Sequence, residues 1–266
     1  MIDRLRFEHV ESIDSTNAEL MRRPFGVQPL PPCALLADHQ TAGRGRNGRR
    51  WLDDCERSLL LSVSIDLHAE DARVLGLPLA AGVVLAELLE QHAVSVRLKW
   101  PNDLYLDSPD GPVKAGGILV EARQSGAVRR IVIGCGLNLS PSPAITPDTA
   151  HQPVGALFAV QGPPPREQLA RRLASELVAA TEGFARDGLP PFIDRWRSRD
   201  LLAGQEVDVI RPDGRRDAGI ARGIDEVGAL IVEFDDGHIE HCMAGDVSVR
   251  RRPDAGLPID SGARVK

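Results

Sequence analysis

The sequence predicts an α+β protein: a sheet with packed helices, followed by a small β-barrel at the C-terminal end. Two observations predict this fold class. Apolar runs of strand length alternate with helical patterns through the first two-thirds of the chain. From about Gly204 the pattern changes to short strands separated by Asp-Gly turns, which are typical of a small barrel. We therefore expect one domain over residues 1–200, a second over 204–252 and a patternless tail over 253–266.

Composition and charge limit the classes of function. A chain of 266 residues with 42% hydrophobic and 26% charged residues buries a core of its own. Lys and Arg number 32 against 38 for Asp and Glu, which gives a net charge of −6. This balance argues against a protein that binds bulk nucleic acid or anionic lipid. Any anion-binding site must therefore depend on a local cluster of positive charge.

The cysteines and the N-terminus predict a cytoplasmic protein without a membrane partner. The four cysteines form no Cys-x-x-Cys pair, which argues against a zinc knuckle or a dithiol redox motif. The first residues, MIDRLRFEHVESID, carry charges throughout and lack the apolar stretch of a signal peptide. No apolar run approaches the ~18 residues that a membrane span needs.

The elements of the first domain follow from hydrophobic periodicity. A nearly continuous apolar stretch over 78–92 predicts a central helix packed on the sheet. A stripe of Leu and Phe side chains predicts a surface helix over 167–187, and the proline-rich segment 141–165 is expected to be an extended connection. The expected strands are 33–38, 58–67, 96–99, 113–123 and 131–139 in the first domain, and 205–210, 215–224, 229–234, 238–242 and 246–250 in the second.

The segment 41–51, TAGRGRNGRRW, is the sharpest chemical feature, and we call it the arginine loop. It holds four arginines, three glycines and no acid. Glycines let backbone N–H groups turn toward a ligand, and guanidinium groups offer forked donors for phosphate. The segment is neither a Walker A loop nor a dinucleotide fingerprint, because the required Lys-Ser/Thr and Gly-x-Gly-x-x-Gly patterns are missing. A flexible solvated loop or an arginine-glycine nucleic-acid arm would also have this composition.

Four further motifs place polar residues beside glycine or proline. They are 14–17 (DSTN), 99–103 (KWPND), 113–121 (VKAGGILVE) and 131–138 (IVIGCGLN). Each has a structural explanation: a helix N-cap, a strand-ending turn, an edge lysine that reaches solvent, and a turn-capping Asn. Each also has a functional one, because a lysine within a buried strand needs an anionic partner and strand glycines often mark the approach of a ligand. Taken singly, none of the motifs decides between structure and function.

Taken in chain order, DSTN, QTAGRGRNGRRW, KWPND, KAGGILVE and GLN, followed by a small barrel, closely resemble the biotin–protein ligases. The resemblance covers about residues 8–250. It implies a catalytic domain with a mixed or antiparallel sheet, like that of class II synthetases, and an SH3-like C-terminal domain. It also implies a two-step reaction. The biotin carboxylate attacks the α-phosphate of ATP, and a lysine amine of a biotin carboxyl carrier domain then attacks the biotinyl-5′-adenylate and releases AMP.

The resemblance assigns expected roles to the motif residues. Lys114 and Arg46 are the expected catalytic residues, with Lys114 between the biotin carboxylate and the α-phosphate. The expected biotin-binding residues are Ser15, Thr16, Asn17, Gln40, Arg44, Gly45, Arg46, Lys114 and Gly117. The expected ATP-binding residues are Arg46, Arg49, Trp51, Asn102, Asp103, Lys114 and Asn138. In the barrel, Arg250 is expected to approach the ATP side.

The resemblance also implies substrates and partners. ATP and biotin are the expected substrates, and Mg²⁺ is expected with ATP. Its protein ligands are unknown, although Asn102 and Asp103 are candidates for placing the metal or the phosphates. The expected acceptor is the biotin carboxyl carrier protein of acetyl-CoA carboxylase, and a homodimer is compatible with the family. Repressor members carry a helix-turn-helix domain before the DSTN-type motif; that motif starts here at residue 14, so no DNA binding is expected.

Two alternatives stay open at this point. A carboxylate-activating ligase of related fold would use lipoate or octanoate with the same lysine-centred chemistry. A non-catalytic module would bind nucleotide or nucleic acid through the arginine loop. Replacement of Lys114 separates the two classes, because an enzyme loses adenylation whereas a binding module has no activity to lose.

The arginine loop is expected to act as a lid. Like charges and glycines favour disorder, and an anionic adenylate would order the segment and keep water from the anhydride. We therefore expect trypsin to cut at the loop arginines more slowly when biotin and ATP are both present, as measured by mass spectrometry of the fragments. Equal cutting with and without the two ligands would contradict the lid.

Overall fold

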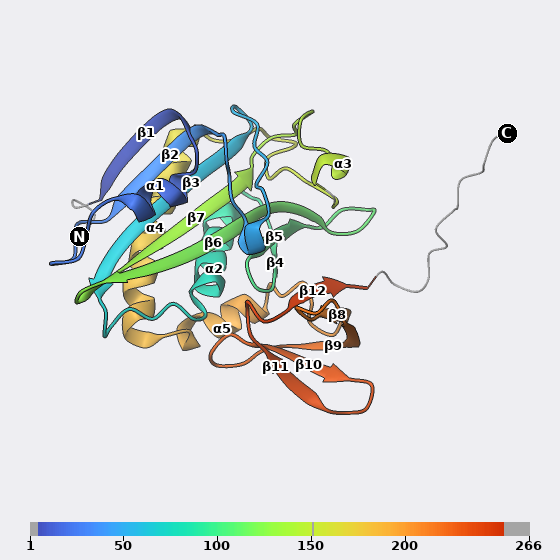
Figure 1. Cartoon of the computed structure of the whole chain (residues 1–266). Helices are drawn as coiled ribbons and strands as arrows, with labels where there is room; N and C mark the ends of the chain where they lie inside the picture. Colours follow the sequence, from blue (N-terminus) through green and yellow to red (C-terminus); the bar gives the residue numbers. More distant parts are fainter. Residues whose placement is uncertain (1–4, 151, 253–266) are drawn as a thin grey trace.

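A seven-stranded sheet flanked by helices makes up the larger part of the computed structural model, which describes residues 5–150 and 152–252 (Figure 1). The strand order is β1-β2-β3-β7-β6-β5-β4, parallel between β1 and β2 and antiparallel elsewhere. The strands are β1 Arg6–Ile13, β2 Cys33–Gln40, β3 Ser58–His68, β4 Arg97–Lys99, β5 Asp103–Leu106, β6 Val113–Ser125 and β7 Val128–Asn138. The expected mixed sheet is confirmed.

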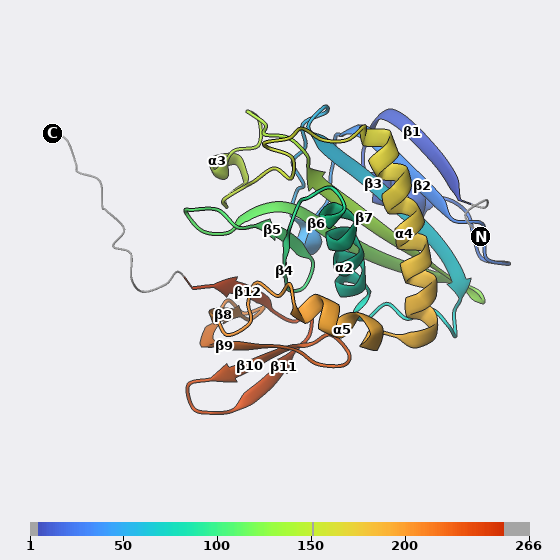
Figure 2. The same ribbon diagram turned by 180° about the vertical axis from the view of Figure 1, so that it is seen from behind.

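Helices cover the two faces of this sheet unequally. The long helices α2 (Leu77–Glu90) and α4 (Arg166–Asp187) pack on one face and on each other (Figure 2). The short helix α1 (Thr16–Arg22) lies on the opposite face, against β3 and β7. Both long helices were expected within two residues of these bounds. Since α2 and α4 bury their apolar side chains on one face, the other face is left for the motif residues.

The C-terminal part is an antiparallel sheet in the order β11-β10-β9-β8-β12. Its strands are β8 Glu206–Ile210, β9 Arg216–Ile224, β10 Leu230–Phe234, β11 Ile239–Cys242 and β12 Ser248–Arg251. The five expected strands are present. Among the described residues no strand pair joins β11 to β12, which is the pair that would close the expected barrel. Three side chains of the first domain donate hydrogen bonds to carbonyl oxygens of the C-terminal part: Trp100 Nε1 to Gly228 O at 3.0 Å, Lys99 Nζ to Val249 O at 2.9 Å and Arg197 Nη2 to Ile224 O at 2.9 Å.

Several elements lie outside the expected set. Strands β1 and β5 were not expected, because β1 is a half-exposed edge strand rich in charge and β5 has four residues. The helix α5 (Pro190–Arg197) begins with two prolines, which a helix tolerates in its first turn. The expected extended connection over 141–165 contains one short helix, α3 (Pro147–Ala150). The expected tail over 253–266 lies outside the described residues, and none of the described helices is long and apolar enough to cross a membrane.

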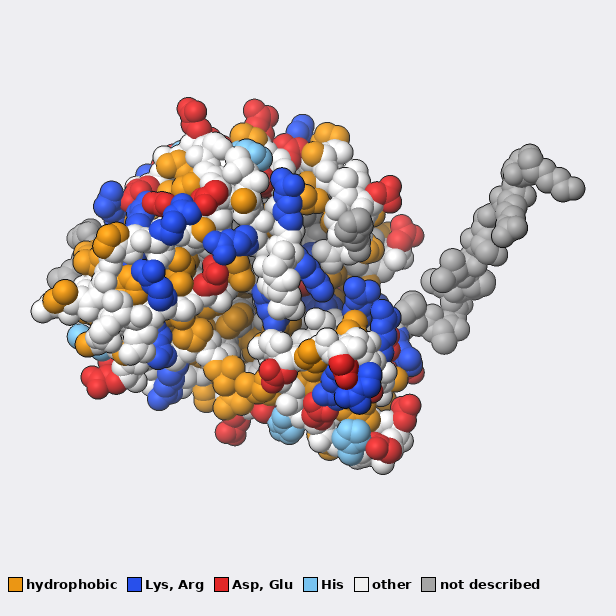
Figure 3. All heavy atoms as spheres, in the orientation of Figure 1, with side chains coloured by type: hydrophobic (Ala, Val, Ile, Leu, Met, Phe, Trp, Pro, Cys, Tyr) orange, Lys and Arg blue, Asp and Glu red, His pale blue; other side chains and the backbone are white. Residues whose placement is uncertain are grey.

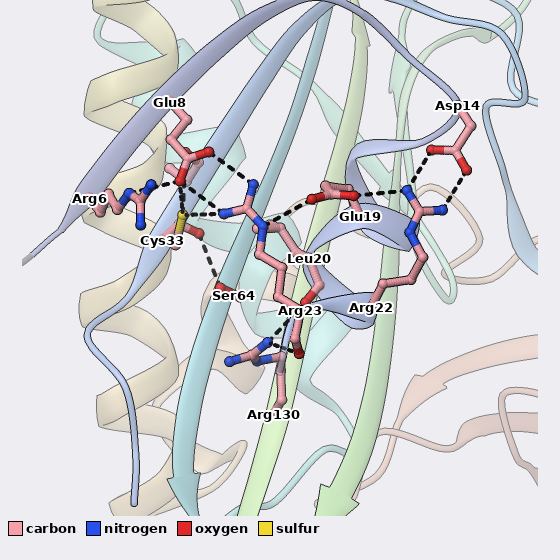
Figure 4. Close-up of polar contacts among 11 residues, drawn as sticks. Arg6, Glu8, Asp14, Glu19, Leu20, Arg22, Arg23, Cys33, Ser64 and Arg130 are labelled. Carbon is pink, nitrogen blue, oxygen red and sulfur yellow. Dashed lines mark hydrogen bonds and ion pairs between the residues drawn. The ribbon is translucent and has the colours of Figure 1, made fainter. Parts of the chain in front are cut away.

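A buried ion pair anchors α1 to the sheet. Arg130 on β7 lies directly opposite Asp66 on β3, and both side chains are almost fully buried, with Nε–Oδ1 at 2.7 Å. The same guanidinium donates to the carbonyl oxygens of Leu20 and Arg23 at the end of α1 (Figure 4). Because a helix end leaves carbonyl groups without helical partners, this contact fixes where α1 ends.

A second set of ion pairs holds α1 from the solvent side (Figure 4). Arg23 pairs with Glu8 on β1 at 2.9 Å and with Glu19 at 3.2 Å. Arg22 pairs with Asp14 at 2.6 Å, and this hydrogen-bonded pairing is the main reason that the pKa of Asp14 falls to about 2. Since exposed pairs are worth little individually, the buried Arg130–Asp66 pair is the stronger anchor.

Removal of one partner of the buried pair is expected to be costly. Asp66→Asn leaves the Arg130 charge uncompensated in the interior and is expected to lower the free energy of unfolding by about 3–5 kcal/mol. The matched control is Glu167→Gln, which breaks the exposed Arg171–Glu167 pair. This substitution is expected to change the free energy of unfolding by less than about 1 kcal/mol. Urea unfolding measures both changes, and equal effects would contradict the anchor.

Candidate active site

The predicted site residues surround one cavity of about 1010 Å³. A cavity of this size lies at the upper end of the range for small-molecule sites, ~300–1,000 Å³. It is enclosed by the first turn of α1, the arginine loop, the central strands β3, β6 and β7, and β12 of the C-terminal sheet. The predicted residues in its lining are Ser15, Thr16, Asn17, Gln40, Arg44, Gly45, Arg46, Arg49, Trp51, Asn102, Asp103, Lys114, Gly117, Asn138 and Arg250. The fold therefore brings together every residue to which the resemblance assigned a binding or catalytic role.

One side of the cavity is a chain of neutral hydrogen bonds, which we call the polar wall: Gln40, Thr16, Ser62 and Asn17. Thr16 donates to Gln40 Oε1 from its N–H at 2.8 Å and from its hydroxyl at 3.1 Å. The Thr16 hydroxyl also lies 2.7 Å from Ser62 Oγ, which donates to Asn17 Oδ1 at 2.5 Å. All four side chains are buried. The wall is thus fixed before a ligand arrives, as specific recognition of a polar group requires.

Two glycines of β7 make room for this arrangement. A Cβ at Gly134 would lie 2.9 Å from the Asn17 Cγ atom, and one at Gly136 would lie 2.7 Å from Trp51 Nε1. Real Cβ contacts are longer, so only glycine lets these two side chains lie against the sheet. The predicted Gly117 faces the same region, since its Cβ would lie 3.2 Å from the Trp51 ring. The strand glycines therefore allow side chains of the protein itself, Asn17 and Trp51, to pack closely against the strand backbone.

Lys114 lies in the cavity beside an acid and an aromatic ring. Its Nζ is 2.7 Å from Asp103 Oδ1 and 5.7 Å from the centroid of a Trp51 ring. Its backbone pairs with Val154, so the strand that carries it is held from both edges. The expected anionic partner of this lysine is thus Asp103, and the solvent-reaching alternative is wrong because the Lys114 side chain is 16% exposed.

The arginine loop is folded against the cavity. Arg44 and Arg50 form an antiparallel bridge, and the tip contains one 3₁₀ turn over Arg46–Gly48. Arg46 Nη1 donates to Asn102 Oδ1 at 3.3 Å, and Asn102 Nδ2 donates to Ile118 O at 2.6 Å. Burial lowers the pKa of Arg46, and Asp103 partly opposes this effect. A desolvated guanidinium held by an amide is well placed for an anion.

Positive charge dominates the lining. Among its described residues nine are Lys or Arg and one, Asp103, is acidic. We call the nine the cationic cluster: Arg44, Arg46, Arg49, Arg50, Lys99, Lys114, Arg250, Arg251 and Arg252. Lys and Arg side chains gather along the middle of this face, above the C-terminal sheet (Figure 3). In a protein of net charge −6, such a cluster marks a site for a multiply charged anion.

Two predicted residues also have structural contacts. Ser15 is the N-cap of α1, since its hydroxyl accepts from Ala18 N at 3.4 Å. Asn138 Nδ2 donates to Gly155 O at 3.2 Å, which ties the end of β7 to the 141–165 connection. The expected N-cap is therefore confirmed for Ser15, whereas Asn138 bonds to a distant segment and not to a turn beside it, and both side chains line the cavity.

Ser62 and Lys99 are among the lining residues that sequence reasoning did not assign to the site. Ser62 lies within the apolar run SLLLSVSI of β3, where a serine looks like a tolerated core residue. Lys99 begins the KWPND motif and faces the cavity from the end of β4, where burial lowers its pKa. A polar residue within a buried strand was the available signal for Ser62.

Comparisons with known proteins identify the family. The sequence model of the Biotin/lipoate A/B protein ligase family matches residues 10–138, and that of the Biotin protein ligase C terminal domain matches residues 203–250. The bifunctional ligase/repressor BirA of Escherichia coli K12 is 39% identical over 240 residues, which cover 90% of this chain and 72% of that protein. The chain belongs to the biotin protein ligase family. It is therefore an ATP-dependent ligase, and the non-catalytic alternative is wrong.

Further relatives agree with this assignment. The biotin–[acetyl-CoA-carboxylase] ligase of Mycobacterium tuberculosis H37Rv is 34% identical over 245 residues, covering 90% of this biotin protein ligase and 86% of that enzyme. The structure of the Aquifex aeolicus biotin protein ligase in complex with biotin and ATP superposes with a TM-score of 0.75 at 26% identity, over 93% and 99% of the two chains. The C-terminal match and these relatives favour biotin over lipoate or octanoate.

The glycine at position 136 offers a test of the cavity geometry. Gly136→Ala is expected to push Trp51 off β7 and to raise the KM for ATP at least about tenfold, equivalent to 1.4 kcal/mol of binding. The control is Gly183→Ala on α4, where the nearest atom to an added Cβ is 3.9 Å away, so activity is expected to stay unchanged. Steady-state kinetics measure both variants. An unchanged KM for Gly136→Ala would show that Trp51 does not contact the nucleotide.

Proposed function

We propose that this enzyme activates biotin with ATP to give biotinyl-5′-adenylate and then transfers the biotinyl group to a lysine of the biotin carboxyl carrier protein of an acetyl-CoA carboxylase. One observation carries the proposal: a neutral polar wall and a cationic cluster share one cavity. Along β7, Asn17 lies over Gly134 and Trp51 over Gly136, with Lys114 beside Trp51. A ligand with a neutral head and an acidic tail would contact each part in turn.

The polar wall suits the ureido head of biotin. A ureido group presents one carbonyl acceptor and two N–H donors, which need matched partners when they are buried. Thr16, Asn17 and Gln40 of the wall, together with the neighbouring Ser15, supply hydroxyl, amide and backbone groups of both kinds. We assign these four residues to biotin, together with Gly117, whose lack of a side chain keeps the cavity open.

The cationic cluster suits the carboxylate and the phosphates. In the first step a carboxylate oxygen forms a bond to the α-phosphorus while the bond to the pyrophosphate oxygen breaks, so two anions must be brought together. We assign Arg44, Gly45 and Arg46 to the carboxylate and phosphates, and Lys114 to the bridging position between them. Positive groups fixed in a desolvated site stabilise charge that builds up in the transition state.

In the second step a neutral lysine amine of the carrier attacks the carbonyl carbon of the anhydride. The C–N bond forms, the bond to the AMP oxygen breaks, and the nitrogen loses a proton to solvent. The phosphate of AMP leaves as an anion, which Arg46 and Lys114 would stabilise again. The arginine loop would cover the anhydride until the carrier arrives.

The nucleotide would lie beside Trp51. The Trp51 Nε1 atom is buried and has no hydrogen-bond partner among the described residues, so it is a donor that a bound group would satisfy. We assign Arg49, Trp51, Asn102, Asp103 and Asn138 to ATP, and place Arg250 on the ATP side. These residues approach the cavity from four separate segments of the chain.

We propose Mg²⁺ as the metal that accompanies ATP. Asp103 is the one carboxylate of the described lining, and the described residues contain no group of three or more His, Cys, Asp or Glu side chains that would hold a metal. This donor set fits an ion held mainly by phosphate oxygens, with Asp103 and the Asn102 amide beside it. Such an ion neutralises phosphate charge when it is bound. A homodimer and a cytoplasmic location remain predictions.

Biotin-dependent exchange of labelled pyrophosphate into ATP tests the function. We expect exchange with biotin and none with lipoate or octanoate as parallel acids. Lys114→Ala is expected to lower the exchange rate about 10²–10³-fold, because one fixed positive group is lost from the transition state. Arg171→Ala on the outer side of α4 is the control and should keep full activity. Exchange with another acid, or none from the folded enzyme with Mg²⁺, would overturn the proposal.

A further inference from the structure

Glu121 on β6 joins the polar wall of the cavity to the arginine loop. Its Oε2 accepts a hydrogen bond from Asn17 Nδ2 at 2.9 Å, and its Oε1 lies 4.0 Å from Arg44 Nη1. The carboxylate is 31% exposed and lies outside the cavity lining, so it would not contact a ligand directly. One side chain thus contacts a residue assigned to the biotin head and another assigned to the biotin carboxylate.

The contact with Asn17 sets the direction of the hydrogen bonds in the polar wall. Asn17 Nδ2 donates to Leu119 O at 3.3 Å and to Glu121, while Oδ1 accepts from Ser62 Oγ. A flipped amide would turn its oxygen toward the Glu121 carboxylate, and the two acceptors would repel each other. Since the Ser62 hydroxyl points its proton at Asn17, Ser62 can only accept from Thr16, and the one hydroxyl proton of Thr16 is then shared between Ser62 Oγ and Gln40 Oε1. Glu121 therefore sets the direction of the hydrogen bonds in the polar wall from Asn17 through Ser62 to Thr16.

The contact with Arg44 restrains the start of the arginine loop. Arg44 is half exposed, and Glu121 is its ion-pair partner among the described residues. Asp14 lies close enough for the Arg44 charge to contribute to its lowered pKa, after the larger effect of Arg22. At 4.0 Å the Arg44–Glu121 pair is loose, so an arriving anion can compete for the guanidinium.

We propose that Glu121 is a positioning residue that couples the biotin pocket to the arginine loop. One carboxylate oxygen fixes the Asn17 amide for recognition of the biotin head, and the other keeps Arg44 near the cavity for the acidic end of the ligand. The inference rests on the function proposed above, because that function gives Asn17 and Arg44 their ligands.

Two substitutions separate the two contacts. Glu121→Gln keeps an acceptor for Asn17 and removes the charge that faces Arg44. It should leave the Kd for biotin within about twofold of the wild-type value and speed release of biotinyl-adenylate about fivefold, the upper range for an exposed ion pair. Glu121→Ala removes both contacts. It should also weaken biotin binding about tenfold, because the buried Asn17 donor loses its partner.

The control is Glu11→Gln, which makes the same charge change at an exposed carboxylate of β1 outside the cavity. Calorimetry gives the Kd for biotin, and a chase of labelled adenylate gives its release rate. A double-mutant cycle with Asn17→Ala tests the contact between Asn17 and Glu121 directly, because a general loss of stability would not change the coupling between the two residues. The Asn17→Ala/Glu121→Ala enzyme should bind biotin no more weakly than Asn17→Ala alone.

The outcomes separate this inference from the proposed function. Faster adenylate release in Glu121→Gln with an unchanged Kd for biotin supports the coupling, and release at the wild-type rate overturns it. Additive losses in the Asn17 cycle also overturn it, because the two residues would then act independently. If Glu121→Ala does not fold, Glu121→Gln still decides the loop contact. Absence of biotin-dependent exchange in the wild-type enzyme would instead overturn the proposed function.

Discussion

The close approach of two side chains to the backbone of β7 is the constraint on which the cavity depends. Asn17 arrives from the first turn of α1 and Trp51 from the end of the arginine loop, and both lie where a Cβ at Gly134 or Gly136 would collide with them. Each side chain fixes the segment that carries it. Because the two glycines are two residues apart on the same face of one strand, the polar wall and the nucleotide side of the cavity have a set spacing.

The charged side chains form two groups with different roles: ion pairs around α1, which we call the anchoring side, and the lining of the cavity, which we call the ligand side. On the anchoring side, Arg130 is matched by Asp66, and Arg22 and Arg23 are matched by acids around α1. On the ligand side, nine Lys and Arg side chains of the lining have one acid among them. Outside the lining, Glu121 lies 4.0 Å from Arg44 and Asp208 lies 2.7 Å from Arg252, so part of the cluster is compensated before an anion binds. Imbalance of this kind is typical of a functional site, whereas the matched pairs serve the fold.

The elements that the sequence predicted share continuous or strongly periodic apolar patterns. The runs of β3 and β7 and the helix α2 are buried at most of their positions, so their apolar composition defines them. The elements that it missed, β1, β5, α3 and α5, are half exposed, four residues long or opened by prolines. In such segments the secondary structure comes from pairing with a neighbour, and local propensity is too weak to reveal it.

The sequence by itself determined the chemistry of the enzyme: the arginine loop, the KWPND turn and the lysine before the paired glycines carry groups whose types and order suffice to define a family. Tertiary structure alone decided which groups touch. Asp103 as the partner of Lys114, Ser62 as a link of the polar wall and Glu121 as the contact of Asn17 and Arg44 all depend on strand register. The physical reason is that side-chain type is a local property, whereas a hydrogen bond between β3 and α1 exists only after both have packed on β7.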